Sequence, residues 1–158
     1  MKHKLNFDKN GFLIPHEKIE SNIEIMKEYF VDAFPKSQTR KTLFQNYEKY
    51  IADFRFEIFP HFEQWIGGSF ISKKEKPNDI DFVTFLDYKI VELRGKTIDK
   101  FWNFSLESKH IDSYIVEEYP NDHEKFDKYR KSQELKHKLY STTREGIPKG
   151  YLKFIFTK

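Results

Sequence analysis

The spacing of apolar residues along the chain separates three amphipathic segments from four short apolar runs. In the three segments, apolar residues recur every three or four positions, which is the period of an α-helix with one buried face. The four runs are short and lie between turn signals, as strands do. We expect helices over residues 21–34, 37–59 and 123–140, and strands over residues 62–66, 80–86, 110–116 and 151–156.

A further helical stretch, residues 87–105, connects the second strand to the third, and Gly95 interrupts it. A strand, a helical crossover and another strand predict a parallel pair. The run over residues 80–86 is apolar on both faces, which indicates a strand inside the sheet. The sequence therefore predicts an α+β (mixed α/β) protein with a small mixed β-sheet flanked by helices, with N-terminal helices and a C-terminal helix-strand extension.

Local signals predict how the amino-terminal part begins. Asn10 and the glycine after it are a turn signal, so a small hairpin is expected in the extended arm of residues 1–20, although Pro15 disfavours a central strand. Ser21 is the expected N-cap of the first helix, with Glu24 completing a capping box. Pro35 is expected to end that helix.

Composition narrows the class of protein. A chain of 158 residues with 38% hydrophobic and 34% charged residues fits one globular domain spanning residues 1–158. Aromatic residues make up 18% of the chain and are expected to fill the core. There is no cysteine, which excludes disulfides and thiolate metal sites. No run reaches the ~20 apolar residues of a membrane span and the N-terminus lacks a signal-peptide pattern, so we expect a cytoplasmic protein without a membrane segment.

The distribution of charge leaves two interpretations open. The helix at 123–140 has an apolar side formed by Phe126, Tyr129, Leu135 and Leu139, and it also carries six basic residues. These could follow an RNA backbone, but interspersed acids and a net charge of only +3 favour a solvated face. Arg40, on the preceding long helix, could face a nucleotide, although a solvent-exposed position is the favoured expectation.

The candidate chemistry is concentrated between Trp65 and Leu86. A Gly67-Gly68-Ser69 turn follows the first strand, and after nine intervening residues Asp79 and Asp81 lie at the head of the second. Side chains alternate along a strand, so these two acids face the same way, and the parallel pairing would bring Asp112 beside them. Three carboxylates suit divalent cations, and a turn of small residues lets a phosphate approach backbone amides.

Other constellations have little support. The six histidines show no paired spacing for zinc, no serine lies in a nucleophile elbow, and no P-loop pattern occurs. Lys73, in the polar loop after the turn, could reach a triphosphate, although a mobile side chain at the surface is the favoured expectation.

The pattern Ile66-Gly67-Gly68-Ser69, nine residues, then Asp79-Ile80-Asp81-Phe82 resembles the signature of the DNA polymerase β-like nucleotidyltransferase superfamily. The resemblance covers residues 62–117 and implies a nucleotidyltransferase fold. It implies that Asp79, Asp81 and Asp112 are catalytic and bind Mg²⁺ or Mn²⁺. It also implies that Gly68 and Ser69 contact the phosphates of a nucleoside triphosphate. Gly67, in the same turn, and Lys73, in the loop after it, are the further nucleotide-binding candidates.

By the same resemblance, the expected activity is transfer of a nucleoside monophosphate from an NTP to an acceptor hydroxyl, on a protein side chain or an RNA end such as that of tRNA. Small bacterial members often belong to toxin–antitoxin or phage-defence pairs, so a protein partner is also expected. The alternative is a non-catalytic antitoxin or binding module that keeps the fold and masks a partner. Neither the donor base nor the acceptor leaves a motif in the chain.

Overall fold

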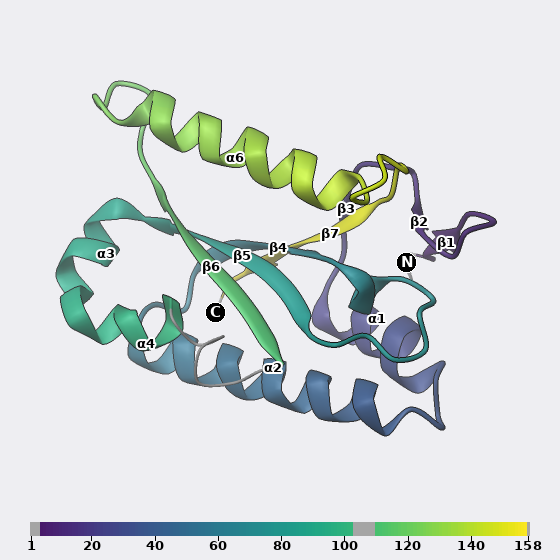
Figure 1. The fold of residues 1–158 in the computed structure, drawn as a ribbon. Coiled ribbons are helices and arrows are strands. Elements are labelled where there is room, and N and C mark those ends of the chain that lie inside the picture. The colour runs from purple at the N-terminus through teal and green to yellow at the C-terminus, as the bar shows by residue number, and fades with distance from the viewer. Residues whose placement is uncertain (1–3, 103–109, 158) are drawn as a thin grey trace.

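A five-stranded mixed sheet forms the centre of the protein in the computed structural model, which describes residues 4–102 and 110–157 (Figure 1). The strand order is β3-β7-β4-β5-β6. All four predicted strands are present, and β3 is an additional edge strand that pairs parallel to β7. The α+β class with a mixed sheet is thereby confirmed. The strands are β3 (Lys18–Glu20), β4 (Phe62–Gly67), β5 (Ile80–Asp87), β6 (Ile111–Glu118) and β7 (Tyr151–Phe156).

The predicted crossover joins β5 to β6, and these two strands are parallel. It consists of α3 (Tyr88–Arg94), a 3₁₀ turn, η3 (Gly95–Ile98), and α4 (Asp99–Trp102), so the helix does break at Gly95. The last part of the predicted crossover, residues 103–105, lies outside the described residues. Strand β5 is buried on both faces from Phe82 to Leu86, as its apolar pattern indicated.

The amino-terminal arm contains the expected hairpin, formed by β1 (Asn6–Phe7) and β2 (Leu13–Ile14). The predicted cap of the first helix, α1 (Ile23–Lys27), is wrong by one residue. Asn22 caps it, with its side chain accepting from the Ile25 amide over 2.9 Å. The Ser21 amide instead donates to the Lys153 carbonyl, because the chain is still paired with β7 there. A π-helix, η1 (Glu28–Asp32), continues α1 and ends before Pro35.

Helix α2 (Gln38–Glu57) is capped by Ser37, the residue at which the predicted helix begins, and its apolar stripe packs on the sheet. Aromatic rings fill this interface: the Tyr50 ring lies 4.9 Å from that of Phe82 and 5.4 Å from that of Phe101. The expected solvent-exposed position of Arg40 is wrong, because its side chain is fully buried. Within residues 4–102 and 110–157, no helix has the length and apolar character needed to cross a membrane.

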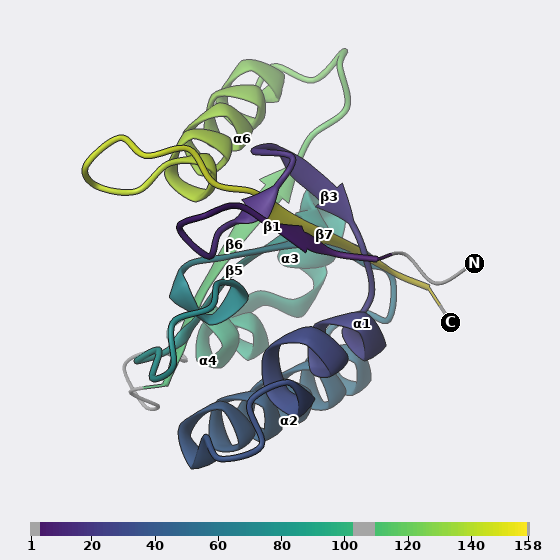
Figure 2. The ribbon, with the colours of Figure 1, turned by 90° about the vertical axis from the view of Figure 1, so that its right-hand side faces the viewer.

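Helix α6 (Phe126–Ser141) covers the face of the sheet opposite to α1 and α2 (Figure 2). It begins three residues later than predicted, after a turn over residues 121–125. Its predicted apolar side is wrong at Leu135 and Leu139, which are 69% and 57% exposed. The helix packs instead through the stripe of Tyr129, Lys136 and Tyr140, with Tyr140 buried, so the leucines point away from the sheet.

A chain of buried hydrogen bonds ties α2 to the sheet and yields a first prediction. The Tyr47 hydroxyl donates to Gln64 Oε1, and Gln64 Nε2 donates to Thr84 Oγ1 over 2.9 Å. Tyr47→Phe leaves the Gln64 oxygen unpaired in the core, so we expect the free energy of unfolding in urea to fall by about 1–3 kcal/mol. Phe56→Leu is the control, since its ring on the same helix is 92% exposed. Equal stability of Tyr47→Phe and wild type would contradict the prediction.

Candidate metal centre

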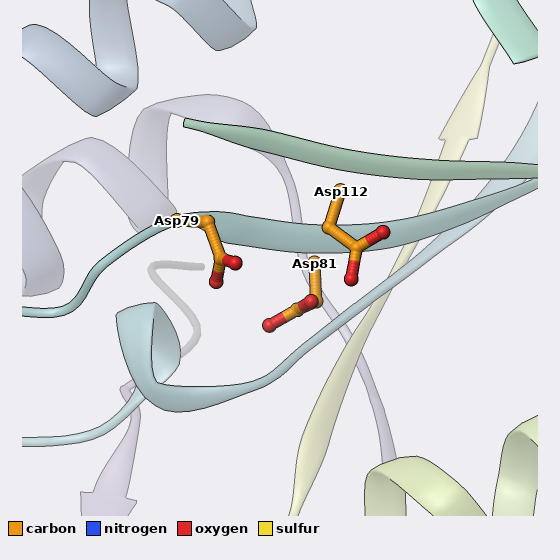
Figure 3. A group of neighbouring side chains, drawn as sticks. All are labelled: Asp79, Asp81 and Asp112. Atoms are coloured by element: carbon orange, nitrogen blue, oxygen red, sulfur yellow. The ribbon is translucent and has the colours of Figure 1, made fainter. Parts of the chain in front are cut away.

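Three aspartates lie together at the amino-terminal ends of the parallel strands β5 and β6. Asp81 is the second residue of β5 and Asp112 the second of β6, and the two are Cα partners in the parallel register. Asp79 directly precedes β5. Each residue offers one carboxylate oxygen, and these oxygens lie within 4.8 Å of one another (Figure 3). The structure thus brings Asp112, which lies outside the sequence motif, beside Asp79 and Asp81, which lie within it. The predicted parallel crossover requires this arrangement.

The close approach of the three carboxyl groups changes their protonation. Burial and the charge of Asp112 raise the pKa of Asp79. Burial, together with hydrogen bonding to Asp112 and the charge of Asp79, raises the pKa of Asp81 to about 8. Without a cation, Asp81 therefore holds its proton at neutral pH, because further negative charge here is unfavourable.

The donor set indicates which ion would relieve this repulsion. All three side chains offer hard carboxylate oxygens, and no histidine among residues 4–102 and 110–157 belongs to the cluster. Such ligands suit Mg²⁺ or Mn²⁺ better than zinc, which favours nitrogen and sulfur. A divalent cation among the three acids would supply the charge that the proton on Asp81 now supplies. The residues present therefore fit the metal that the sequence analysis expects.

The glycine turn is shaped by its contact with the acids. Gly68 has a φ of 75°, and a Cβ on it would lie 2.0 Å from Asp81 Oδ2. Gly67 is the register partner of Asp81 across β4 and β5, and a Cβ there would lie 2.4 Å from the Tyr140 ring. Gly67 is therefore buried under α6, whereas Gly68 lies directly against an acid of the cluster. Only a residue without a side chain fits at either position.

Two open cavities meet at this turn. The smaller, of about 440 Å³, is lined by Gly68, Ser69 and Lys73, three of the predicted nucleotide contacts. The larger, of about 650 Å³, has Asp81 and Asp112 in its wall. Gly67 lines neither of the two. The Lys73 ammonium also lies 4.7 Å from the ring of Phe7, so the amino-terminal hairpin borders the smaller cavity.

Residues without a motif complete the site. Lys149 lines both cavities, and burial lowers its pKa while the charge of Asp81 opposes the shift. Lys136 is held with its ammonium 3.4 Å from the centre of the Tyr114 ring, near Asp112. A helical wheel anchored on Tyr140 rather than on the leucines would have turned Lys136 toward the sheet. Lys149 has no such signal, because it lies in a loop.

Comparison with known proteins places the site inside a recognised sequence family. A family model described as "Family of unknown function (DUF6932)" matches residues 5–155. No curated protein and no solved structure matches the chain. The matched range includes the three aspartates, the glycine turn and Lys149.

Proposed function

Because the chain belongs to the family of unknown function DUF6932, we propose its function from the acidic site itself: metal-dependent transfer of a nucleoside monophosphate from an NTP to an acceptor hydroxyl. The observation that carries the proposal is the convergence of Asp79, Asp81 and Asp112 against the Gly68 turn. Under this proposal the sheet and its helices are a small nucleotidyltransferase fold of the DNA polymerase β-like type. We place the protein in the cytoplasm, since it has no cysteine that would need an oxidising compartment.

The three aspartates would hold Mg²⁺ or Mn²⁺. Bound there, the cation would neutralise the charge that develops on the phosphoryl oxygens. Asp81 has to lose its proton to become a ligand, so binding of the metal is expected to release protons and to weaken as the pH falls. The glycine turn keeps the backbone close to Asp81 without a side chain between them.

The transfer balances as a displacement at phosphorus. A bond forms between the acceptor oxygen and the α-phosphorus of the NTP. The bond from the α-phosphorus to the oxygen that bridges it to the β-phosphorus breaks, and pyrophosphate leaves with that oxygen. We assign Asp112 to orient the acceptor hydroxyl and accept its proton, because it lies in the wall of the larger cavity. The smaller cavity would hold the polyphosphate, whose charge Lys73, Lys74 and Lys149 would offset.

Lys149 provides a test of this assignment. Lys149→Met keeps most of the apolar stem and removes the ammonium, so we expect the Kd of an NTP with Mg²⁺ to rise about tenfold, as for the loss of one charge-assisted contact. Calorimetric titration measures this directly. Lys131→Met on the exposed side of α6 is the matched control and should bind as wild type does. An unchanged Kd for Lys149→Met would remove Lys149 from the phosphate site.

A second candidate function is a binding module that covers a partner protein without catalysis. The observation that favours it is the exposure of Leu135 and Leu139, which stand on the rim of the larger cavity beside Tyr114. Exposed apolar groups at a site often mark a protein interface. A protein partner of the toxin–antitoxin or phage-defence kind fits this rim, and a protein side chain is then the acceptor to test first, before an RNA end.

One experiment separates the two candidates. The protein is incubated with each of the four α-labelled NTPs and Mg²⁺ or Mn²⁺, with and without candidate protein and tRNA acceptors, and both NTP binding and label transfer are measured. We expect one or more NTPs to give transfer that the double change Asp79→Ala, Asp81→Ala abolishes. Wild-type protein that binds no NTP with either Mg²⁺ or Mn²⁺ would refute catalysis. Partner binding that survives the double change, without transfer, would favour the binding module.

A further inference from the structure

Arg40 is a fully buried cation in an unusual place. It lies in the first turn of α2, where the helix dipole disfavours positive charge, so it does not serve the stability of that helix. Burial lowers its pKa only to about 10, so the side chain stays charged at neutral pH. A buried charge is costly unless hydrogen bonds or an ion pair compensate it. The contacts of its guanidinium group show what does.

The guanidinium group binds four backbone carbonyls. Nη1 donates to the carbonyls of Phe30 and Phe70, over 3.0 and 2.6 Å, and Nη2 donates to those of Ser72, over 2.8 Å, and Lys74. The group also stacks near the ring of Phe34, 4.1 Å from its centre. In the part of the chain that the structure describes, no carboxylate forms an ion pair with Arg40. Its ligands are thus neutral carbonyls, mostly from one loop.

Three of these carbonyls belong to the segment that follows the Gly68-Ser69 turn. The same segment carries Lys73 and Lys74 into the smaller cavity, and the charge of Lys74 also acts on Asp79. Phe70 and Ile71 anchor the start of this segment in the core, whereas the side chains from Lys73 to Lys76 are exposed and do not hold the loop. The Lys73 amide donates to the Gly11 carbonyl over 3.0 Å. Arg40 grips its backbone from behind, and Ser37 Oγ adds one bond to the Glu75 carbonyl over 3.2 Å.

We propose that Arg40 is a positioning residue: it holds the loop of residues 70–74 in the conformation that presents Lys73 and Lys74 to a bound polyphosphate. The ligand class rests on the proposed function, whereas the hold on the loop does not. The planar fork of arginine matches several carbonyls at once, and a lysine ammonium keeps the charge without that geometry. Arg40→Lys therefore separates the positioning of the loop from the charge.

The test uses the full chain and three measurements on Arg40→Lys. Tryptic cleavage after Lys73 and Lys74, without ligand, reports the order of the loop. Titration with inorganic triphosphate and Mg²⁺ reports the polyphosphate site without regard to the base, and titration with Mn²⁺ alone reports the acid cluster. We expect cleavage about tenfold faster, triphosphate binding about tenfold weaker and Mn²⁺ binding within about twofold of wild type.

The matched control is Arg55→Lys at the other end of α2. Arg55 donates to one backbone carbonyl, that of Thr157 over 2.6 Å, so its replacement should leave all three measurements unchanged. Wild-type cleavage and wild-type triphosphate affinity in folded Arg40→Lys would overturn the proposal. If Arg40→Lys does not fold, Phe34→Leu, which removes the stacked ring, is compared with wild type in the same way. We then expect loop cleavage about threefold faster and triphosphate binding about threefold weaker. An unchanged cleavage rate and an unchanged triphosphate affinity in Phe34→Leu would also overturn the proposal.

The outcomes distinguish this proposal from the proposed function. If wild-type protein binds no triphosphate while Arg40→Lys is cleaved faster in the loop, the function is wrong and the hold on the loop is correct. If triphosphate binds to both proteins equally, the polyphosphate site exists and Arg40 does not position it.

Discussion

Asp81→Asn is expected to abolish nucleotidyl transfer and, at the same time, to raise the melting temperature of the metal-free protein. The carboxylate is needed as a metal ligand, but without a metal it lies partly buried beside Asp79 and Asp112. Asparagine keeps the shape and removes the repulsion. We expect a rise of about 3 °C or more at pH 8 by calorimetry in EDTA. Mg²⁺ should raise the melting temperature of wild type and not that of the variant.

The pH dependence follows from the raised pKa of Asp81. Its pKa is about 8 in the folded, metal-free protein against an ordinary value of 3.8, so between these values the folded state holds a proton that the unfolded state has lost. Stability from this group is therefore complete below about pH 4 and is lost as the pH rises toward 8. Asparagine does not titrate, so the difference between variant and wild type should widen over this range.

The control for this prediction is Asp53→Asn. Asp53 forms a surface ion pair with Lys49 at 2.6 Å, and its loss should change the unfolding free energy by no more than about 1 kcal/mol in the opposite direction. Equal melting temperatures of wild type and Asp81→Asn at pH 8 in EDTA would contradict the repulsion that we infer. A metal-induced rise retained by Asp81→Asn would place the cation elsewhere.

Gly68→Ala is the second change for which we expect a large effect. The new Cβ would meet Asp81 Oδ2 at 2.0 Å and would sit on a residue with φ of 75°. Asp81 has to move, so we expect Mn²⁺ affinity to fall about 100-fold, which corresponds to about 2.7 kcal/mol, and transfer to be lost. The backbone strain by itself contributes only about 1 kcal/mol to instability.

Gly146→Ala separates the two contributions. Gly146 has a φ of 83° but nothing lies within 4 Å of the added Cβ, so this variant carries the backbone strain without the clash. It should bind Mn²⁺ as wild type does and melt only a few degrees lower. If Gly68→Ala and Gly146→Ala bind Mn²⁺ equally well, the contact between the turn and Asp81 does not shape the site.

The order of elements was predictable because each one carries its own periodic pattern. The stripe of α2, the doubly buried β5 and the crossover to β6 follow from local spacing. The additional strand β3 was not predictable from the sequence. It has only three residues, which are too few to show a periodic pattern of apolar positions, and it pairs with β7 at the far end of the chain. The exposed side of α6 was mispredicted because Tyr129 and Tyr140 outweigh two leucines in packing on the sheet, a choice made by tertiary contacts.

The candidate site was predictable where chemistry and chain direction coincide. Asp79, Asp81 and Asp112 follow from side-chain alternation and one parallel pairing. Gly67 belongs to the motif, but it packs against the Tyr140 ring. Sequence spacing alone does not distinguish a glycine required for packing from one that contacts a phosphate. Lys149 lines the site and Arg40 binds the backbone of the loop beside it, both from elements distant in sequence, so their places depend on the assembled fold.

A crystal structure with Mn²⁺ and a non-hydrolysable NTP analogue tests the central claim most directly. Anomalous scattering locates the metal without reference to the fold. The account predicts Mn²⁺ ligated by carboxylate oxygens of Asp79, Asp81 and Asp112, with the triphosphate beside Gly68 and Ser69 and its charge toward Lys149. Mn²⁺ and nucleotide bound away from these three aspartates, or no binding at concentrations well above those of cellular NTPs, would contradict it.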